Sequence, residues 1–169
     1  MTSEVSLRAF REGDAAEVTG LLHRAYGELG ARGLNFTAVD QDVETTVRRA
    51  SAGSCWVAVS GGRIVATSTV CLPPHEGLRA LTRHARVPCR AWLNQLAVDP
   101  PLRGRGYARL LREHGFAWAR AAGATSIGLD TAQSADHLVR LYQAWGFSHR
   151  DTVQVPGKVY QSVVMIRPL

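Results

Sequence analysis

Cysteine and lysine are both scarce in this sequence of 169 residues, and histidine is thinly spread. The three cysteines are Cys55, Cys71 and Cys89, and none of them forms a CxxC pair. An odd number of scattered cysteines argues against a disulfide framework or a zinc site and suits a reducing compartment. The six histidines do not fall at ligand spacing either, so we expect no metal.

Long hydrophobic runs are also missing. The first ten residues, MTSEVSLRAF, contain no basic region followed by an apolar stretch, so the sequence predicts no signal peptide. Every apolar stretch is far too short to cross a bilayer, which predicts no membrane-spanning segment. These features together predict a cytoplasmic protein.

The composition is that of an ordinary globular protein, with 46% hydrophobic and 20% charged residues. The length suits one domain with its own core, so residues 1–169 are expected to form a single domain. The net charge is +6, and Lys158 is the only lysine among the positive residues. An excess of arginine favours an anionic ligand, and loose affinity for nucleic acid is the less favoured interpretation.

Hydrophobic periodicity predicts alternating strands and helices along the chain. The first strand covers 5–10, and a helix then opens at Gly13-Asp14, with Asp14 as its N-cap. The glycines of 27–35 predict a mobile connection, and a second helix starts near Thr37 or Asp40 and ends around 51–53. Two β-rich segments, 55–60 and 64–72, flank Gly61-Gly62 and predict a hairpin.

The second half predicts strand 91–98, helix 107–122, strand 125–130, helix 135–145 and two closing strands around Pro156-Gly157. No internal repeat or linker interrupts this order. It predicts one α/β domain with a mixed sheet.

The stretch QLAVDPPLRGRGYARLL, from Gln95 to Leu111, joins a strand to a helix through two glycines flanked by arginines. Free N–H groups in a first helical turn, together with the helix dipole, favour a bound anion. Glycine lets the backbone approach such a ligand closely. A tight turn on a basic surface is the alternative interpretation.

The sequence of this loop excludes two common phosphate-binding motifs. A P-loop requires Gly-Lys-Ser/Thr, which is absent here. A dinucleotide-binding loop requires a third glycine where Arg109 stands, and belongs in the first βαβ unit instead of mid-chain.

The loop resembles the acyl-CoA signature of the GNAT superfamily of N-acetyltransferases: Arg or Gln, two variable residues, Gly, one variable residue, and Gly or Ala. The matching residues run from Arg103 to Ala108. The preceding LAVDP of 96–100 and the later LYQAWGF of 141–147 are similar to two further segments of that superfamily. The expected element order is similar as well. The resemblance therefore implies the GNAT fold, a mostly antiparallel mixed sheet whose central strands splay apart between flanking helices.

The resemblance also implies where acetyl-CoA binds. The pyrophosphate would lie on the N–H groups of the loop, and the pantetheine arm would pair with the strand before it. The implied cofactor-binding residues are Leu96, Ala97, Val98, Arg103, Gly104, Arg105, Gly106, Tyr107, Ala108 and Arg109. Whether the side chains of Arg103, Arg105 and Arg109 reach the phosphates or remain on a solvated surface stays open.

Two residues are candidates for proton transfer. Tyr142 matches the tyrosine that, in the superfamily, donates a proton to the departing sulfur, although packing in the core is its alternative role. Many members carry a glutamate on the central strand, but here that face has Trp92 and Asn94, which do not serve as bases. Asp130 then becomes the candidate base, with a turn-forming role or a water chain as the alternatives.

The implied activity is N-acetyl transfer to the primary amine of a small molecule. Its site would be lined by the segment from Tyr26 to Gln41 and by the closing strands. A protein or peptide N-acetyltransferase and a non-catalytic acyl-CoA-binding module remain open alternatives. The basic insertion between Pro73 and Pro88, with Leu78, Leu81 and Ala85 as one apolar stripe, is expected to be a decorated loop, with a lid or a homodimer contact as alternatives.

Overall fold

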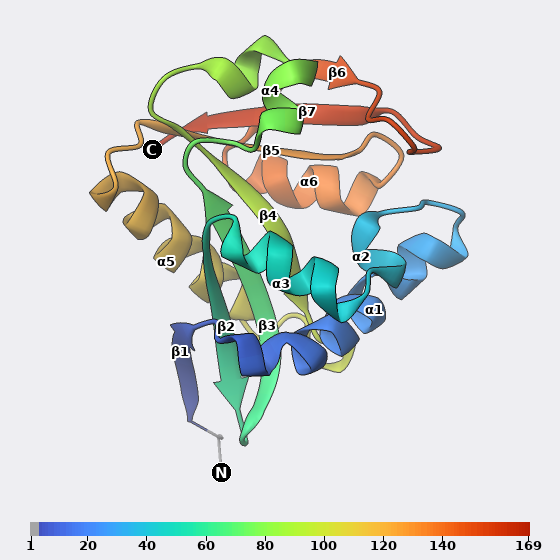
Figure 1. Ribbon diagram of the computed structural model, residues 1–169, viewed down its shortest axis with the longest axis vertical. Coiled ribbons are helices and arrows are strands. Elements are labelled where there is room, and N and C mark those ends of the chain that lie inside the picture. The colour runs from blue at the N-terminus through green and yellow to red at the C-terminus, as the bar shows by residue number, and fades with distance from the viewer. Residues whose placement is uncertain (1–3) are drawn as a thin grey trace.

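A seven-stranded sheet runs through the molecule in the order β1-β2-β3-β4-β5-β7-β6 (Figure 1). The computed structural model describes residues 4–169. All neighbouring strands are antiparallel except β4 and β5, which run parallel. This confirms the expected mixed, mostly antiparallel sheet. The strands are β1 Val5–Ala9, β2 Ser54–Ser60, β3 Arg63–Cys71, β4 Arg90–Val98, β5 Ser126–Ala132, β6 Ser148–Val153 and β7 Ser162–Pro168.

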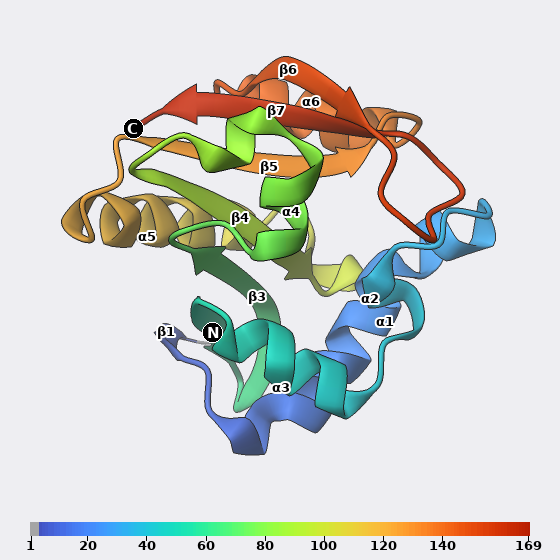
Figure 2. The same ribbon diagram turned by 45° about the horizontal axis from the view of Figure 1, so that its top comes forward.

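Helices cover both faces of this sheet. In Figures 1 and 2, helices α1 to α4 lie in front of it, and α5 and α6 lie behind it. The largest group of buried side chains sits where α5 and α6 pack against the middle strands. The helices are α1 Ala15–Ala31, α2 Thr37–Asp40, α3 Val43–Ser51, α4 Glu76–Leu81, α5 Tyr107–Ala121 and α6 Asp136–Ala144, with short 3₁₀ turns at Glu12–Asp14, Arg83–Arg86 and Pro100–Leu102.

The hairpin predicted at Gly61-Gly62 is confirmed. Both glycines have positive φ, 58° and 76°, as a two-residue turn between twisted strands requires. Strands β2 and β3 pair antiparallel on either side of the turn.

The start and end of the first helix differ from the expectation. The Asp14 carboxylate does not cap α1; it accepts the backbone N–H of Arg11 and pairs with Arg8 at 2.7 Å. The helix also continues to Ala31, through most of the segment expected to be a mobile connection. Gly30 explains this, because a Cβ there would lie 2.7 Å from a methyl group of Val39. Gly30 therefore allows α1 and α2 to pack closely and does not form a turn.

The second expected helix is divided in two. Helix α2 ends at Asp40, and the Asp42 carboxylate then caps α3 by accepting the N–H of Thr45 at 2.8 Å. The break turns Gln41 inward, where its side chain is buried. There it bonds to Gln95 and Arg49.

The insertion between Pro73 and Pro88 folds into α4 and a 3₁₀ turn that pack on the sheet. Leu78 and Ala85 are buried against Trp92, Val164 and Ile166. Two of the three residues of the expected apolar stripe therefore cover the sheet, whereas Leu81 is partly exposed and lines the cavity. The insertion is part of the core and not a decoration on the surface.

Candidate functional site

Strands β4 and β5 separate soon after they begin. They pair only from Arg90 to Trp92 on β4, opposite Ser126 to Gly128 on β5. Farther along β4, Gln95 adopts φ of 52°, close to a register shift in the pairing with β3. A bulge of this kind bends a strand out of its neighbour's line. The sheet therefore splits, as the resemblance implied, and a cavity of about 750 Å³ occupies the opening.

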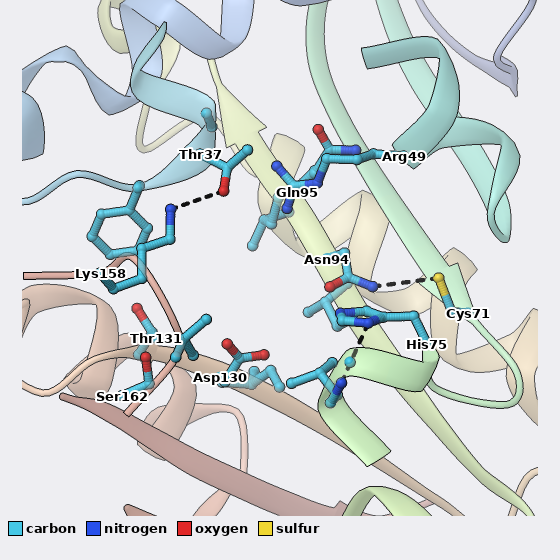
Figure 3. Close-up of a pocket in the computed structure, with 18 of the residues that line it drawn as sticks. Thr37, Arg49, Cys71, His75, Asn94, Gln95, Asp130, Thr131, Lys158 and Ser162 are labelled. Carbon is cyan, nitrogen blue, oxygen red and sulfur yellow. Dashed lines mark hydrogen bonds between the residues drawn. The ribbon is translucent and has the colours of Figure 1, made fainter. Parts of the chain in front are cut away.

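The cavity draws its walls from distant parts of the chain. Residues of α1 to α4 line it from the front, and Leu138 and Tyr142 of α6 line it from behind. Figure 3 shows Asn94 and Gln95 on β4, with Asp130 and Thr131 of β5 across from them. The expectation that the segment after Tyr26 and the closing strands face this space agrees with the structure, since Phe36, Thr37, Val155, Lys158 and Tyr160 all line it.

Asp130 provides the only carboxylate in the lining. Its Oδ1 accepts a hydrogen bond of 2.9 Å from the indole N–H of the fully buried Trp92. Burial raises the pKa of Asp130, although the Trp92 hydrogen bond and the positive charges of His75 and Arg49 act in the opposite direction. A carboxylate with a raised pKa, held at the edge of a cavity, is suited to accept a proton.

Glycine explains how Trp92 reaches this position. A Cβ on Gly128 would lie 2.3 Å from the Trp92 ring, so only glycine leaves room for the indole between the strands. Trp92 was considered as an unsuitable base in the sequence, but its donor role toward Asp130 was not predicted. The sequence signal for this role is the pairing of a tryptophan with a glycine, Trp92 opposite Gly128, across the two parallel strands.

Tyr142 lies on α6, and its side chain is buried at the back of the cavity. Its ring packs edge-on against Trp145 and Phe147, so part of the side chain belongs to the core. Its hydroxyl makes no hydrogen bond within residues 4–169, the part of the chain described. Burial raises the pKa of Tyr142, which keeps the phenol protonated and able to donate.

A second tyrosine, Tyr26 of α1, reaches the same cavity. Its hydroxyl donates to the Leu96 carbonyl on β4 over 2.9 Å, and burial raises its pKa to about 12. In the sequence, Tyr26 was named only as the start of the segment expected to line the acceptor site. The contact with Leu96 fixes α1 against the strand that borders the split.

Past Trp92, no residue of β4 pairs with β5 in the described part of the chain. Ala97 and Val98 still pair with β3 on the other side. The β5-facing edge of residues 96–98 is thus open to an extended ligand arm. This arrangement fits the pantetheine arm that the resemblance implies, with Leu96 also lining the cavity.

The glycine loop begins α5 just beyond this strand. Gly104 and Gly106 have φ of 77° and 88°, and a Cβ on either would meet no atom within 4 Å. The first N–H to bond back into the helix is that of Leu110, which donates to Gly106. The N–H groups of Tyr107, Ala108 and Arg109 precede it and are left for an external acceptor. The loop is therefore open and fits a phosphate group.

The three arginines of the loop differ in their contacts. Arg103 turns toward α1, where it donates to the Ala25 carbonyl and pairs with Glu28 at 3.3 Å. Arg109 pairs with Glu113 one turn along α5. Arg105 makes no hydrogen bond or ion pair within the described chain and is exposed. In this structure Arg103 anchors the loop, and Arg105 is the arginine left available to a ligand.

The comparisons with known proteins agree with this architecture. A profile of the Acetyltransferase (GNAT) family matches residues 19–147. A search among curated proteins found no match. Many solved structures share the fold. The ribosomal-protein-S18-alanine N-acetyltransferase of Escherichia coli has a TM-score of 0.72 at 16% identity, over 98% of this chain and 94% of that one.

Two further structures are similar over almost their whole length. A putative acetyltransferase of Salmonella typhimurium, yncA, solved with its cofactor acetyl-CoA, has a TM-score of 0.71 at 16% identity, over 99% of this chain and 95% of that one. PH1933 of Pyrococcus horikoshii has a TM-score of 0.75 at 15% identity, over 98% and 99%.

Residues 4–169 lack two features. None of the helices there combines the length and hydropathy needed to span a membrane. No group of three or more potential metal ligands occurs in the same range.

Proposed function

Because the chain belongs to the acetyltransferase (GNAT) family, we propose that it moves an acetyl group from acetyl-CoA to the primary amine of a small molecule. The observation that carries the proposal is the split between β4 and β5. It brings a partly buried carboxylate, a buried phenol and an open strand edge to one cavity. The similar Salmonella typhimurium structure holds acetyl-CoA, which supports the same donor here.

The glycine loop would hold the pyrophosphate, and the open edge of 96–98 would hold the pantetheine arm. Acetyl-CoA supplies a thioester whose carbonyl carbon accepts the amine. Backbone N–H groups at the Gln95 bulge are suited to stabilise negative charge that develops on the carbonyl oxygen. These roles use the backbone, which explains why few side chains specify them.

Asp130 and Tyr142 would divide the proton transfers. The acceptor arrives as an ammonium, and Asp130 takes its proton, directly or through a water, so that the nitrogen can attack. The C–S bond breaks as the new C–N bond is completed, and Tyr142 would donate its proton to the leaving sulfur. The nitrogen then loses its second proton, which restores the Tyr142 phenol, and Asp130 releases its proton to solvent. Burial raises both pKa values: it keeps the Tyr142 phenol protonated as a donor, and it makes the ionised Asp130 carboxylate a stronger base.

A small acceptor is favoured over a peptide because the cavity mouth is bridged. The Asn35 side chain donates to the Gly157 carbonyl and accepts from the Val159 N–H, at 2.9 and 3.0 Å. These bonds tie the segment after α1 to the loop between β6 and β7. A peptide would need an open groove at this position.

The test is release of CoA thiol from acetyl-CoA with a panel of small amines and short peptides, each compared with a reaction that contains no amine. We expect acceleration by at least one small amine, and acetylated product in equal amount by mass spectrometry. Acceleration by peptides alone would favour the peptide N-acetyltransferase. Binding of acetyl-CoA without acceleration by any amine would contradict catalysis and favour an acyl-CoA-binding module.

A further inference from the structure

The charges that line the cavity are unbalanced. Three permanent cations, Arg48, Arg49 and Lys158, face it, against the single carboxylate of Asp130. None of these cations forms an ion pair with a carboxylate among residues 4–169. A simple amine is itself a cation at neutral pH, so this wall would repel it. The excess of positive charge therefore argues against an acceptor whose only charge is its ammonium group.

Arg49 is the clearest case. Its guanidinium is partly buried and makes one hydrogen bond, of 2.8 Å, to the Gln41 side-chain oxygen. Gln41 in turn donates to Gln95 and Thr46, so the partner of Arg49 is neutral and fixed in place. Burial lowers the pKa of Arg49, which reflects a charge without a counter-ion. Its remaining N–H donors have no acceptor within the described chain.

Lys158, the only lysine of the protein, repeats this pattern. Its ammonium donates to the Asn35 carbonyl at 2.7 Å and to the Thr37 hydroxyl at 2.9 Å, both neutral. Burial and the nearby charge of Arg49 lower the pKa of Lys158. Figure 3 shows Arg49, Thr37 and Lys158 along one side of the cavity, with Asp130 on the other.

Partly buried cations with neutral partners carry a desolvation cost, and a ligand anion placed between them would offset it. The phosphates of acetyl-CoA do not suit this role, because their proposed site is the glycine loop, which does not line the cavity. The anion then has to come from the acceptor. Its amino group would lie toward Asp130, at the opposite side.

We propose that the acceptor is a small amine that also carries an anionic group, a carboxylate or a phosphate, and that Arg49 and Lys158 bind this group. This inference rests on the proposed function and names its substrate class. It also fixes the orientation of the acceptor. The anionic group would lie on the side of α2 and α3, and the nitrogen would face Asp130 and the thioester.

The first experiment compares acceptors that differ in charge at similar size. β-Alanine is paired with β-alaninamide, and phosphoethanolamine with ethanolamine; the first of each pair carries the anion. We expect kcat/KM to be at least about 10-fold higher for the anionic member of one pair, the value of a charge-assisted contact. The pair that shows the preference identifies carboxylate or phosphate. Equal or better use of both neutral amines overturns the inference while leaving acetyl transfer intact.

The second experiment removes the charges one at a time. Arg49→Gln and Lys158→Met should raise KM for the preferred anionic amine by about 10-fold or more, and should change KM for its neutral counterpart little. Arg150→Gln is the matched control, since Arg150 is an exposed residue of β6 outside the cavity lining. Calorimetry should show unchanged acetyl-CoA affinity in all three. Equal losses for charged and neutral amines would overturn the role of the cations.

A third measurement does not depend on turnover. Propionate and inorganic phosphate, titrated into the CoA-bound protein, should bind wild type more tightly than Arg49→Gln, and the better one should compete with the anionic amine. Thermal melts establish that each variant is folded. If neither anion binds, the inference is wrong. Turnover of a neutral amine would then still support the proposed acetyl transfer.

Discussion

At the scale of single residues, Asp130 and Tyr142 are the two groups whose protonation matters most. Tyr142 is buried and Asp130 is partly buried, and burial raises the pKa of both, but the consequences are opposite. A raised pKa turns a carboxyl into a better base near neutral pH, whereas it turns a phenol into a donor that never ionises under working conditions. The same burial therefore suits the two residues to complementary roles.

Tyr142→Phe isolates the proposed acid. It keeps the ring that packs on Trp145 and Phe147 and removes a hydroxyl without a partner in the described residues. The melting temperature should barely change. The turnover number should fall by about 10²-fold, the lower end of general-acid effects, because a thiolate leaves readily without help. Steady-state kinetics and a thermal melt check this, and full activity in the folded variant would return Tyr142 to a purely structural role.

Asp130→Asn separates catalysis from stability. The folded-state pKa of Asp130 is raised, so the carboxyl binds its proton more tightly in the folded chain than in the unfolded one. Its contribution therefore makes the protein less stable as pH rises through the window between the two pKa values. At neutral pH the variant should melt at a higher temperature than wild type, while the difference disappears in acid.

The catalytic effect of Asp130→Asn should run the other way. Turnover should fall most between the pKa of Asp130 and that of the acceptor amine, where the wild-type carboxylate is ionised and the amine is still an ammonium that needs a base. The loss should shrink above the pKa of the amine, where the free amine is abundant. A pH–rate profile of the same shape as wild type would remove Asp130 from the proton transfer.

Trp92→Phe tests the residue that holds Asp130. The indole N–H lowers the pKa of Asp130, so its loss should raise that pKa and move the acidic limb of the pH–rate profile to higher pH. A smaller ring in a fully buried site also costs stability, about 1–3 kcal/mol. A purely structural role would lower the melting temperature without moving the pH profile, and that result would contradict the positioning role.

At the scale of elements, strands, turns and long amphipathic helices were predictable because their signals are local. The Gly61-Gly62 hairpin and helix α5 lie where the periodicity indicated. Gly30 was interpreted as part of a loop because glycine has the same signal in a turn and in a close helix contact. Only the distance to Val39, a residue of α2, distinguishes the two.

The candidate site also contains parts that the sequence predicts and parts that it does not. The loop from Arg103 to Arg109 was visible as a contiguous motif. The cavity cations and the Trp92–Asp130 bond join residues far apart in sequence, so no local pattern contains them. The Arg103 side chain shows this limit within the motif itself, since its contacts on α1 depend on how that helix crosses the loop.

Helix α5 supplies a matched test of the glycine loop. Gly106 and Gly123 flank its two ends, both with strongly positive φ, 88° and 94°, and both with open space at Cβ. Aspartate at either position suffers similar backbone strain. Gly106→Asp places a negative charge where the pyrophosphate is proposed, so it should abolish measurable acetyl-CoA binding by calorimetry. Gly123→Asp should bind normally, and equal losses in both would show that strain alone is responsible.

At the scale of the whole molecule, the split sheet behaves as two blocks that meet along a short seam. Within residues 4–169, strands β1 to β4 form one block and β5 to β7 the other, and the sheet joins them only by the parallel pairing of 90–92 with 126–128. On the far side of the split, Asn35 and Lys158 connect the blocks through hydrogen bonds across the mouth of the cavity. The width of the cavity therefore depends on contacts at both ends.

Asn35→Ala cuts two of these cross-mouth bonds, the one donated to Gly157 and the one accepted from Val159. The bonds are exposed, so their loss should cost only about 1 kcal/mol of stability. The acceptor KM should rise about 10-fold, because the loop that carries Lys158 loses two of its bonds to the facing segment and keeps those that Lys158 itself makes to the Asn35 carbonyl and Thr37. Acetyl-CoA affinity should remain, since the glycine loop and the open edge of β4 lie elsewhere. Gln154→Ala is the comparison: its amide bonds only within its own loop, to Val155, Lys158 and Tyr160. A larger effect of Asn35→Ala on acceptor KM identifies the bridge between the blocks as the cause, whereas equal effects would assign it to order within the β6–β7 loop alone.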